Sequence, residues 1–195
     1  VAEEVEDAIC ARRGAVPDFE KAKIALTALL DEAGVDVYLQ TCVISAEKVG
    51  EKIEKIETAG KFGNISFSAE VFIDATGDGD IAARAGAEFV LGRESDNKMQ
   101  PATLMFKVGG VDCERAVFLG SFESTYDTPK GELQALAKEH IPFPAGHILT
   151  YETTLPGIVT CNMTNAIETD GTCAEDLTKA TLVCRRQMDD IVKYL

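Results

Sequence analysis

Two stretches of the chain repeat apolar residues at the spacing of an amphipathic helix. Asp18 can cap the first, which Gly34 ends, and a Thr172–Glu175 capping box precedes the second. The apolar stripes are Phe19, Ala22, Leu26, Leu29, Leu30 and Ala33 in the first, and Leu177, Ala180, Cys184, Met188, Ile191 and Leu195 in the second. We therefore predict helices over 18–33 and from 172 to the last residue, and a shorter one over 1–12.

Shorter patterns between these helices predict strands. Val35–Leu39 alternates polar and apolar residues, and three further segments joined by turns predict an antiparallel meander. The meander strands are 41–49, 52–58 and 65–69, with turns at Gly50 and 59–64. The apolar run Val71–Ile73 predicts a core strand buried on both faces, with helix 18–33 packed against its sheet.

The pattern changes after Gly92, where elements become shorter and turns more frequent. The predicted elements are a polar loop over 93–101, strands over 103–108, 148–151 and 158–163, a helix over 113–119 capped by Asp112, and a helix over 129–140. The order of elements predicts an α/β chain of the mixed α+β kind.

The chain is organised around Asp74-Ala-Thr-Gly-Asp-Gly-Asp80, which joins the predicted core strand to a short helix over 81–86. Gly77 and Gly79 allow positive φ and a close approach of the backbone to a ligand. A strand that passes through a glycine turn into a helix presents backbone N–H groups, and α/β proteins bind nucleotides in this way. A sharp turn with acidic residues at the helix start is the simplest alternative.

Two other motifs fit this loop poorly. Gly77–Ala82 matches the phosphate-binding pattern G-x-G-x-x-A, with Glu94 as a ribose ligand. However, only about two helical turns separate it from the apolar run Phe89–Leu91, too few for a βαβ unit, and its carboxylates would repel a pyrophosphate. A calcium loop would need Glu at its twelfth position, which is Ala85.

Composition narrows the classes of partner and compartment. The 195 residues carry a net charge of −14, which argues against nucleic acids and anionic membrane surfaces. No apolar run has the length of a membrane span. Six cysteines form no C-x-x-C pair, and His140 and His147 have no metal-ligand spacing, so we expect free thiols, a cytoplasmic location and no metal site. The first residue is not Met, so we expect a piece of a longer protein.

The segment 74–87 closely resembles the second FAD-contacting motif of flavoproteins in the glutathione-reductase-like superfamily. Three later segments, Gly92–Asp96, Met99–Phe106 and Gly109–Asp112, look like the family called FAD-dependent oxidoreductases, as do Asn162–Thr164 and Asp170–Thr172. Members of that family open with a strand and G-x-G-x-x-G that hold the FAD pyrophosphate, and no such motif precedes Asp74 here.

The resemblance implies FAD as the cofactor and a particular layout. Residues 1–92 would be the second half of a Rossmann-like FAD/NAD(P)-binding domain, and 93–195 a portion of a β-rich substrate domain ending in a long helix. In the family, Ala75, Thr76 and Gly77 let the flavin side of FAD approach, and Asp78 would hydrogen-bond ribityl or nearby hydroxyls. The chain near Val43 would pass the adenine, although an ordinary strand residue explains Val43 equally well.

The sequence shows no nucleophile and no acid–base pair, as expected if the cofactor carries the hydride chemistry. Arg93, Gln100 and Thr103 could face the flavin or an anionic substrate, because arginine binds both oxygens of a carboxylate. Alternatively, Arg93 pairs with Glu94 or Asp96. His140 is a weaker candidate for a general base.

We therefore expect a fragment of a flavin-dependent oxidoreductase that acts on an unknown small substrate. The alternatives are a non-catalytic folded module and a nucleotide-binding regulatory domain without flavin. Without the glycine-rich loop, the chain alone is expected to bind FAD weakly, to be inactive and to self-associate through exposed apolar surface.

Overall fold

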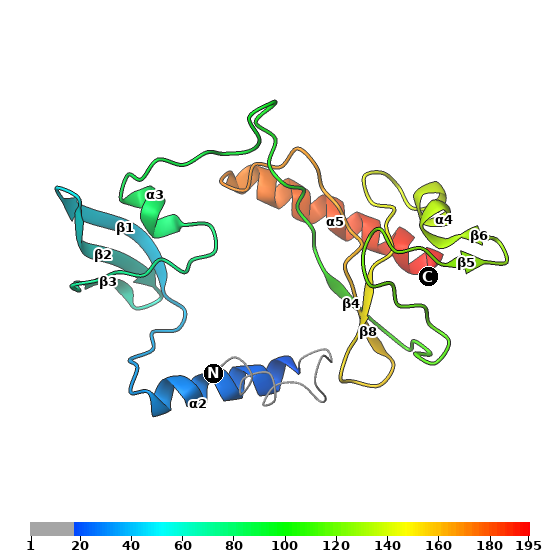
Figure 1. Ribbon diagram of the computed structural model, residues 1–195, viewed down its shortest axis with the longest axis horizontal. Coiled ribbons are helices and arrows are strands. Elements are labelled where there is room, and N and C mark those ends of the chain that lie inside the picture. The colour runs from blue at the N-terminus through cyan, green and yellow to red at the C-terminus, as the bar shows by residue number, and fades with distance from the viewer. Residues whose placement is uncertain (1–17) are drawn as a thin grey trace. The chain divides into compact units, whose positions relative to one another are not determined.

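The computed structural model describes residues 18–195, so the predicted helix over 1–12 lies outside the described residues. The chain divides into two compact units (Figure 1). Residues 30–90 form one, and residues 91–195 with the described chain up to Leu29 form the other. We describe each by itself.

The unit of residues 30–90 is built on the predicted meander, which is confirmed. Its strands are β1 (Cys42–Val49), β2 (Lys52–Gly60) and β3 (Gly63–Phe67), antiparallel in the order β1-β2-β3. The second turn is shorter than predicted, because β2 runs on to Gly60 and only two residues separate it from β3. On β2, the buried Thr58 hydroxyl donates to the Ile65 carbonyl of β3 at 2.9 Å.

Helix α2 (Phe19–Glu32) forms where it is predicted, but its predicted packing is wrong. The Asp18 carboxylate accepts the N–H groups of Glu20 and Lys21 at 3.0 and 3.1 Å, and Gly34 at φ 69° ends the helix. No residue of α2 is buried, and Ile24 is 71% exposed. A helix buries its stripe only against a sheet or another helix, and the sheet predicted for this role does not form.

The predicted core strand Val71–Ile73 is also wrong. Val71 is 76% exposed and Ile73 85%, and no strand pairs with either among the described residues. The predicted strand 35–39 is likewise unpaired. An apolar run gives a segment its preference for extended backbone, but a strand also requires a neighbour to accept and donate its main-chain hydrogen bonds.

The unit that contains residues 91–195 has a small antiparallel sheet in the order β4-β8-β7. Its strands are β4 (Phe106–Gly109), β7 (Thr150–Glu152) and β8 (Ile158–Cys161), and an unpredicted hairpin joins β5 (Asp127–Thr128) to β6 (Gly131–Glu132). The helices are α4 (Leu133–His140) and α5 (Ala174–Tyr194). Ile191 of α5 packs in one core cluster with Val159 and Cys161 of β8. Helices and antiparallel sheets together confirm the mixed fold class.

The core of this unit lies between the sheet and the two helices. Its buried members are Leu119, Ala137, Ile141, Ala145, Ile148, Val159, Cys161, Met163 and Ile191. The predicted stripe of α5 is confirmed at its centre, where Cys184 is 1% and Ile191 0% exposed, but the end residues Leu177 and Leu195 are exposed.

Two buried glutamines hold extended segments that no strand pairs. The side-chain amide of Gln134 on α4 donates to the Ile148 carbonyl at 2.9 Å and accepts the Ile148 N–H at 2.8 Å. Gln187 on α5 makes the same pair of bonds with Asn165, at 2.8 and 2.9 Å. Each amide thus replaces the neighbouring strand that would otherwise satisfy a buried backbone group.

Two helix predictions are wrong in this unit, the start of the last helix and the helix over 113–119. Helix α5 begins after Cys173, and the Thr172 hydroxyl donates to Asp170 at 2.6 Å instead of capping the helix. After Asp112 the chain makes a single turn rather than a helix over 113–119. Val117, Phe118 and Leu119 all pack on the core, whereas consecutive residues of a helix point in different directions.

Candidate functional site

The loop between residues 74 and 80 has the backbone that its glycines predict. Gly77 adopts φ 93° and Gly79 φ 71°, both in the left-handed region that a side chain disfavours. Gly79 then serves as the N-cap of the short helix α3 (Asp80–Arg84). A Cβ placed on either glycine would meet no atom within 4 Å, so the loop surface above them is open.

Asp74 holds the loop in this shape. One carboxylate oxygen accepts the N–H and the hydroxyl of Thr76 at 3.1 and 2.7 Å, and the other accepts the N–H of Ala82 at 2.9 Å. The pKa of Asp74 is lowered, first by the N–H of Ala82 and then by the hydroxyl and N–H of Thr76, because all three stabilise the carboxylate. Sequence analysis assigned Asp74 no role, although a D-x-T turn could have indicated one.

Thr76 completes this network. Its hydroxyl donates to Asp74 and accepts the N–H of Asp80 at 2.8 Å. The side chain of Thr76 is therefore engaged within the loop, and its carbonyl and methyl group are the parts left for a ligand.

The groups that remain free are those a ligand needs. Within the described residues, the backbone N–H groups of Ala75, Gly77, Asp78 and Gly79 make no hydrogen bond to the protein, and neither does the Asp78 carboxylate. Ala75, Gly77 and Asp78 are exposed. A fixed loop with small exposed residues, free N–H donors and one free carboxylate is chemically suited to a cofactor that carries hydroxyls and a polar ring edge.

Val43 lies in the same unit as this loop. Helix α3 buries Ile81, which is 7% exposed, and contacts strand β1, which carries Val43. The register of β1 and β2 shifts between Val43 and Ser45, so the ladder is interrupted beside Val43 by a bulge at an edge strand. Bulges of this kind leave backbone groups unpaired and are frequent next to functional sites.

A second polar loop, over residues 92–98, lies in the other unit. Arg93 donates from Nε and Nη2 to the two carboxylate oxygens of Asp96 at 2.6 and 2.7 Å, which confirms the ion pair that sequence analysis left as an alternative. This bidentate bond lowers the pKa of Asp96 to about 2. Lys98 pairs with Glu168 at 2.7 Å.

A cavity of about 600 Å³ opens beside this loop. Its lining includes Arg93, Lys98 and Gln100, but not Thr103. His140 lies elsewhere in the unit, exposed and with its ring stacked on that of Tyr194 at 6.1 Å between centroids. Sequence analysis grouped Arg93, Gln100 and Thr103, and of these Arg93 and Gln100 line one cavity.

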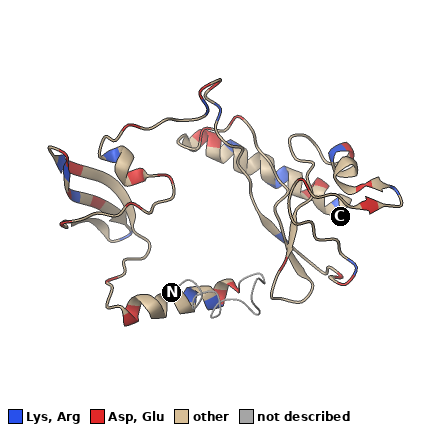
Figure 2. Ribbon diagram, in the orientation of Figure 1, with Lys and Arg blue, Asp and Glu red and all other residues tan. Residues whose placement is uncertain are grey.

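Two other kinds of feature, a metal site and a membrane-spanning helix, have no matching residues in 18–195. No group of three His, Cys, Asp or Glu side chains there is arranged as metal ligands would be, and the five cysteines in that range are free. None of its helices has the length and apolar content needed to span a bilayer. Basic and acidic residues are interspersed over the elements, as Figure 2 shows.

Comparison with known proteins assigns the family. The family model described as FAD dependent oxidoreductase matches residues 2–195, so the chain belongs to this family. Membership implies FAD as the cofactor of the intact protein. Searches of curated proteins and of solved structures found no match.

Proposed function

We propose that this chain is part of an FAD-dependent oxidoreductase in which the 74–80 loop contacts the flavin side of FAD. One observation carries the proposal: the loop is fixed from within by Asp74 and Thr76, while the N–H groups of Ala75, Gly77 and Asp78 stay free and exposed. The family match over nearly the whole chain supports the same conclusion.

The roles of the loop residues follow from what each has available. Ala75 and Gly77 offer backbone donors and no bulk, so a flat ring can approach the main chain. Asp78 accepts hydrogen bonds from hydroxyls of the cofactor. Bound FAD supplies the hydride chemistry, and the residues of this loop hold and orient it.

The same proposal covers the layout of the chain. Residues 1–92 belong to the second half of a Rossmann-like FAD-binding domain, with the interrupted ladder at Val43 beside the adenine. Residues 93–195 form part of the domain that binds a small-molecule substrate. The cysteine content favours a reducing, cytoplasmic compartment.

The test is replacement of Asp78 in the intact, FAD-loaded protein. Asp78→Ala should leave the fold unchanged, since the carboxylate makes no bond to the protein, but should weaken FAD binding. Loss of a charged hydrogen bond costs roughly 1.5–3 kcal/mol, about one to two decades in dissociation constant. Unchanged FAD affinity, measured by flavin fluorescence, would count against the contact.

We also propose that the chain by itself associates with copies of itself. Three extended segments, 35–39, 71–73 and 89–91, expose apolar side chains, and no strand of the described residues pairs with them. Leu39 is 77% exposed and Ile73 85%. Such edges pair readily with other chains, so sedimentation of the purified chain should show oligomers that dissociate on dilution, whereas a concentration-independent monomer would contradict the proposal.

A further inference from the structure

The cavity beside the 92–98 loop has fixed walls. Gly92 adopts φ 71° and packs so closely on Asn97 that a Cβ would overlap the Asn97 carbonyl. Next along the chain to the lining residues Pro101 and Ile167, Ala102 and Ala166 exchange two backbone hydrogen bonds of 2.9 and 2.8 Å. The cavity is therefore held by backbone contacts rather than by mobile side chains alone.

Arg93 lines this cavity and keeps one binding edge free of protein acceptors among the described residues. A guanidinium has two edges that can grip a planar anion, Nε with Nη2 and Nη1 with Nη2. Asp96 occupies the first, and among the described residues no acceptor contacts Nη1. The Arg93 side chain is 67% exposed. Asp96 thus fixes the plane of the guanidinium while the second edge stays available.

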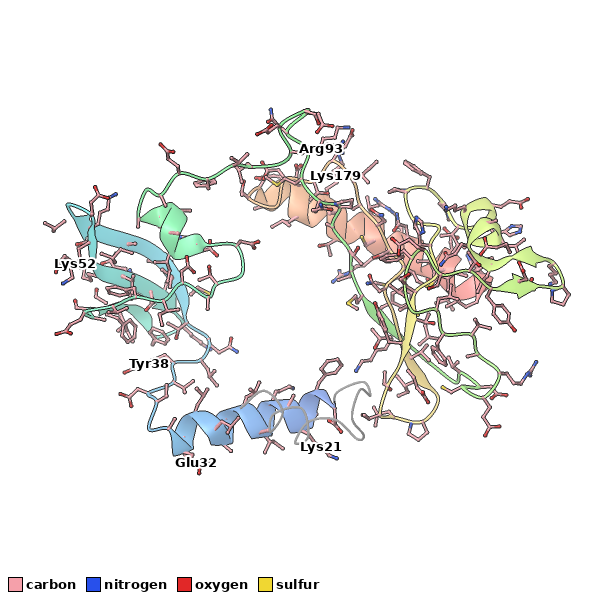
Figure 3. The ribbon with its side chains drawn as sticks, viewed as in Figure 1. Lys21, Glu32, Tyr38, Lys52, Arg93 and Lys179 are labelled. Atoms are coloured by element: carbon pink, nitrogen blue, oxygen red, sulfur yellow. The ribbon has the colours of Figure 1, made fainter. Side chains whose placement is uncertain are left out.

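The charges around the cavity are balanced, unlike those of the chain as a whole. Arg93 and Lys98 line it together with one carboxylate, Glu168. Glu168 is bound by Lys98 and also adjoins Lys179 of α5, with which it lines a neighbouring small cavity. Figure 3 labels Arg93 and Lys179 on these two elements. With Asp96 and with Asp176 of the neighbouring cavity included, three cations stand against three carboxylates, in a chain whose net charge is −14.

We propose that this cavity binds the carboxylate of a small organic acid, held by the free edge of Arg93 with Lys98 and Gln100 beside it. The guanidinium already binds one carboxylate in the plane, and the second edge has the same spacing of donors. The apolar residues Met99, Pro101 and Ile167 line the rest of the cavity and suit a short carbon chain.

The proposal is tested by titrating the whole chain with succinate while backbone amide signals are followed by NMR. Signals of Gly92, Arg93 and Gln100 should shift and saturate, with a dissociation constant on the order of 1 mM. Arg93→Lys keeps the charge but loses the planar fork, and should weaken binding at least about tenfold. Arg185→Lys, the same change at an exposed position of α5, should leave binding unchanged.

Each other outcome contradicts the proposal. Absence of saturation, or equal affinity in Arg93→Lys and the unchanged chain, would remove the site. Equal binding of the neutral analogue succinamide would show that charge plays no part, and equal binding of inorganic phosphate would overturn the choice of a carboxylate. Identifying the acid as the substrate rests on the proposed function, but its binding does not, because the titration contains no flavin.

Discussion

Gln187→Leu is expected to destabilise the unit of residues 91–195 by about 2–6 kcal/mol, because it leaves two part-buried backbone groups of Asn165 without partners at roughly 1–3 kcal/mol each. Gln187 is 6% exposed, so water cannot replace the lost amide without opening the structure. Since domains are stable by only about 5–15 kcal/mol, this is a large fraction of the total. Urea unfolding should show a lower midpoint with an unchanged slope.

Two matched variants separate the loss of this pair of hydrogen bonds from the loss of a glutamine as such. Gln134→Leu removes the equivalent pair of bonds to Ile148 and should cost a similar amount. Gln100→Leu changes an exposed glutamine with no hydrogen bond to the described protein and should stay within about 0.5 kcal/mol. Equal stability of the Gln187 and Gln100 variants would show that the two hydrogen bonds between Gln187 and Asn165 do not stabilise the fold.

Gly92→Ala is expected to break the 92–98 loop. Alanine would have to adopt φ 71° and would also overlap the Asn97 carbonyl. Left-handed backbone costs an L-residue roughly 1–2 kcal/mol, and the overlap should add about 1–3 kcal/mol. Gly110→Ala is the control, because Gly110 has φ 78° in the same unit but no atom within 4 Å of its Cβ position.

The loop itself provides a second readout of this variant. Arg93 holds the pKa of Asp96 at about 2, below the ordinary 3.8. If Gly92→Ala displaces Arg93, the pKa of Asp96 should rise toward its ordinary value, and Gly110→Ala should leave it low. An NMR titration of the Asp96 carboxyl measures this, and a pKa still near 2 in Gly92→Ala would mean that the loop accommodates the methyl group.

Local patterns predict this fold well where neighbouring residues suffice. The meander, helix α2 and the glycine turn before α3 form as predicted, because capping, alternation and positive φ depend on residues close in sequence. Burial of Val71–Ile73 and of α2 was predicted wrongly, because burial depends on a partner surface that the local pattern does not reveal.

In the candidate site, too, features set by neighbouring residues could be predicted, and contacts between distant residues could not. The positive φ of Gly77 and Gly79 could be predicted from the sequence. The hydrogen bond from Ala82 to Asp74 spans eight residues, and the bonds between Gln187 and Asn165 span 22, so neither follows from a local pattern. Arg93 is intermediate: its partner Asp96 lies three residues away and was one of two carboxylates considered.

Hydrogen exchange of residues 74–82 in the intact protein, with and without FAD, tests the central claim most directly. The free N–H groups of Ala75, Gly77 and Asp78 should exchange rapidly without FAD and become protected when it binds, while the turn at Gly50 should not change. Stoichiometric FAD binding with unchanged exchange across 74–82 would contradict the assignment of this loop to the cofactor.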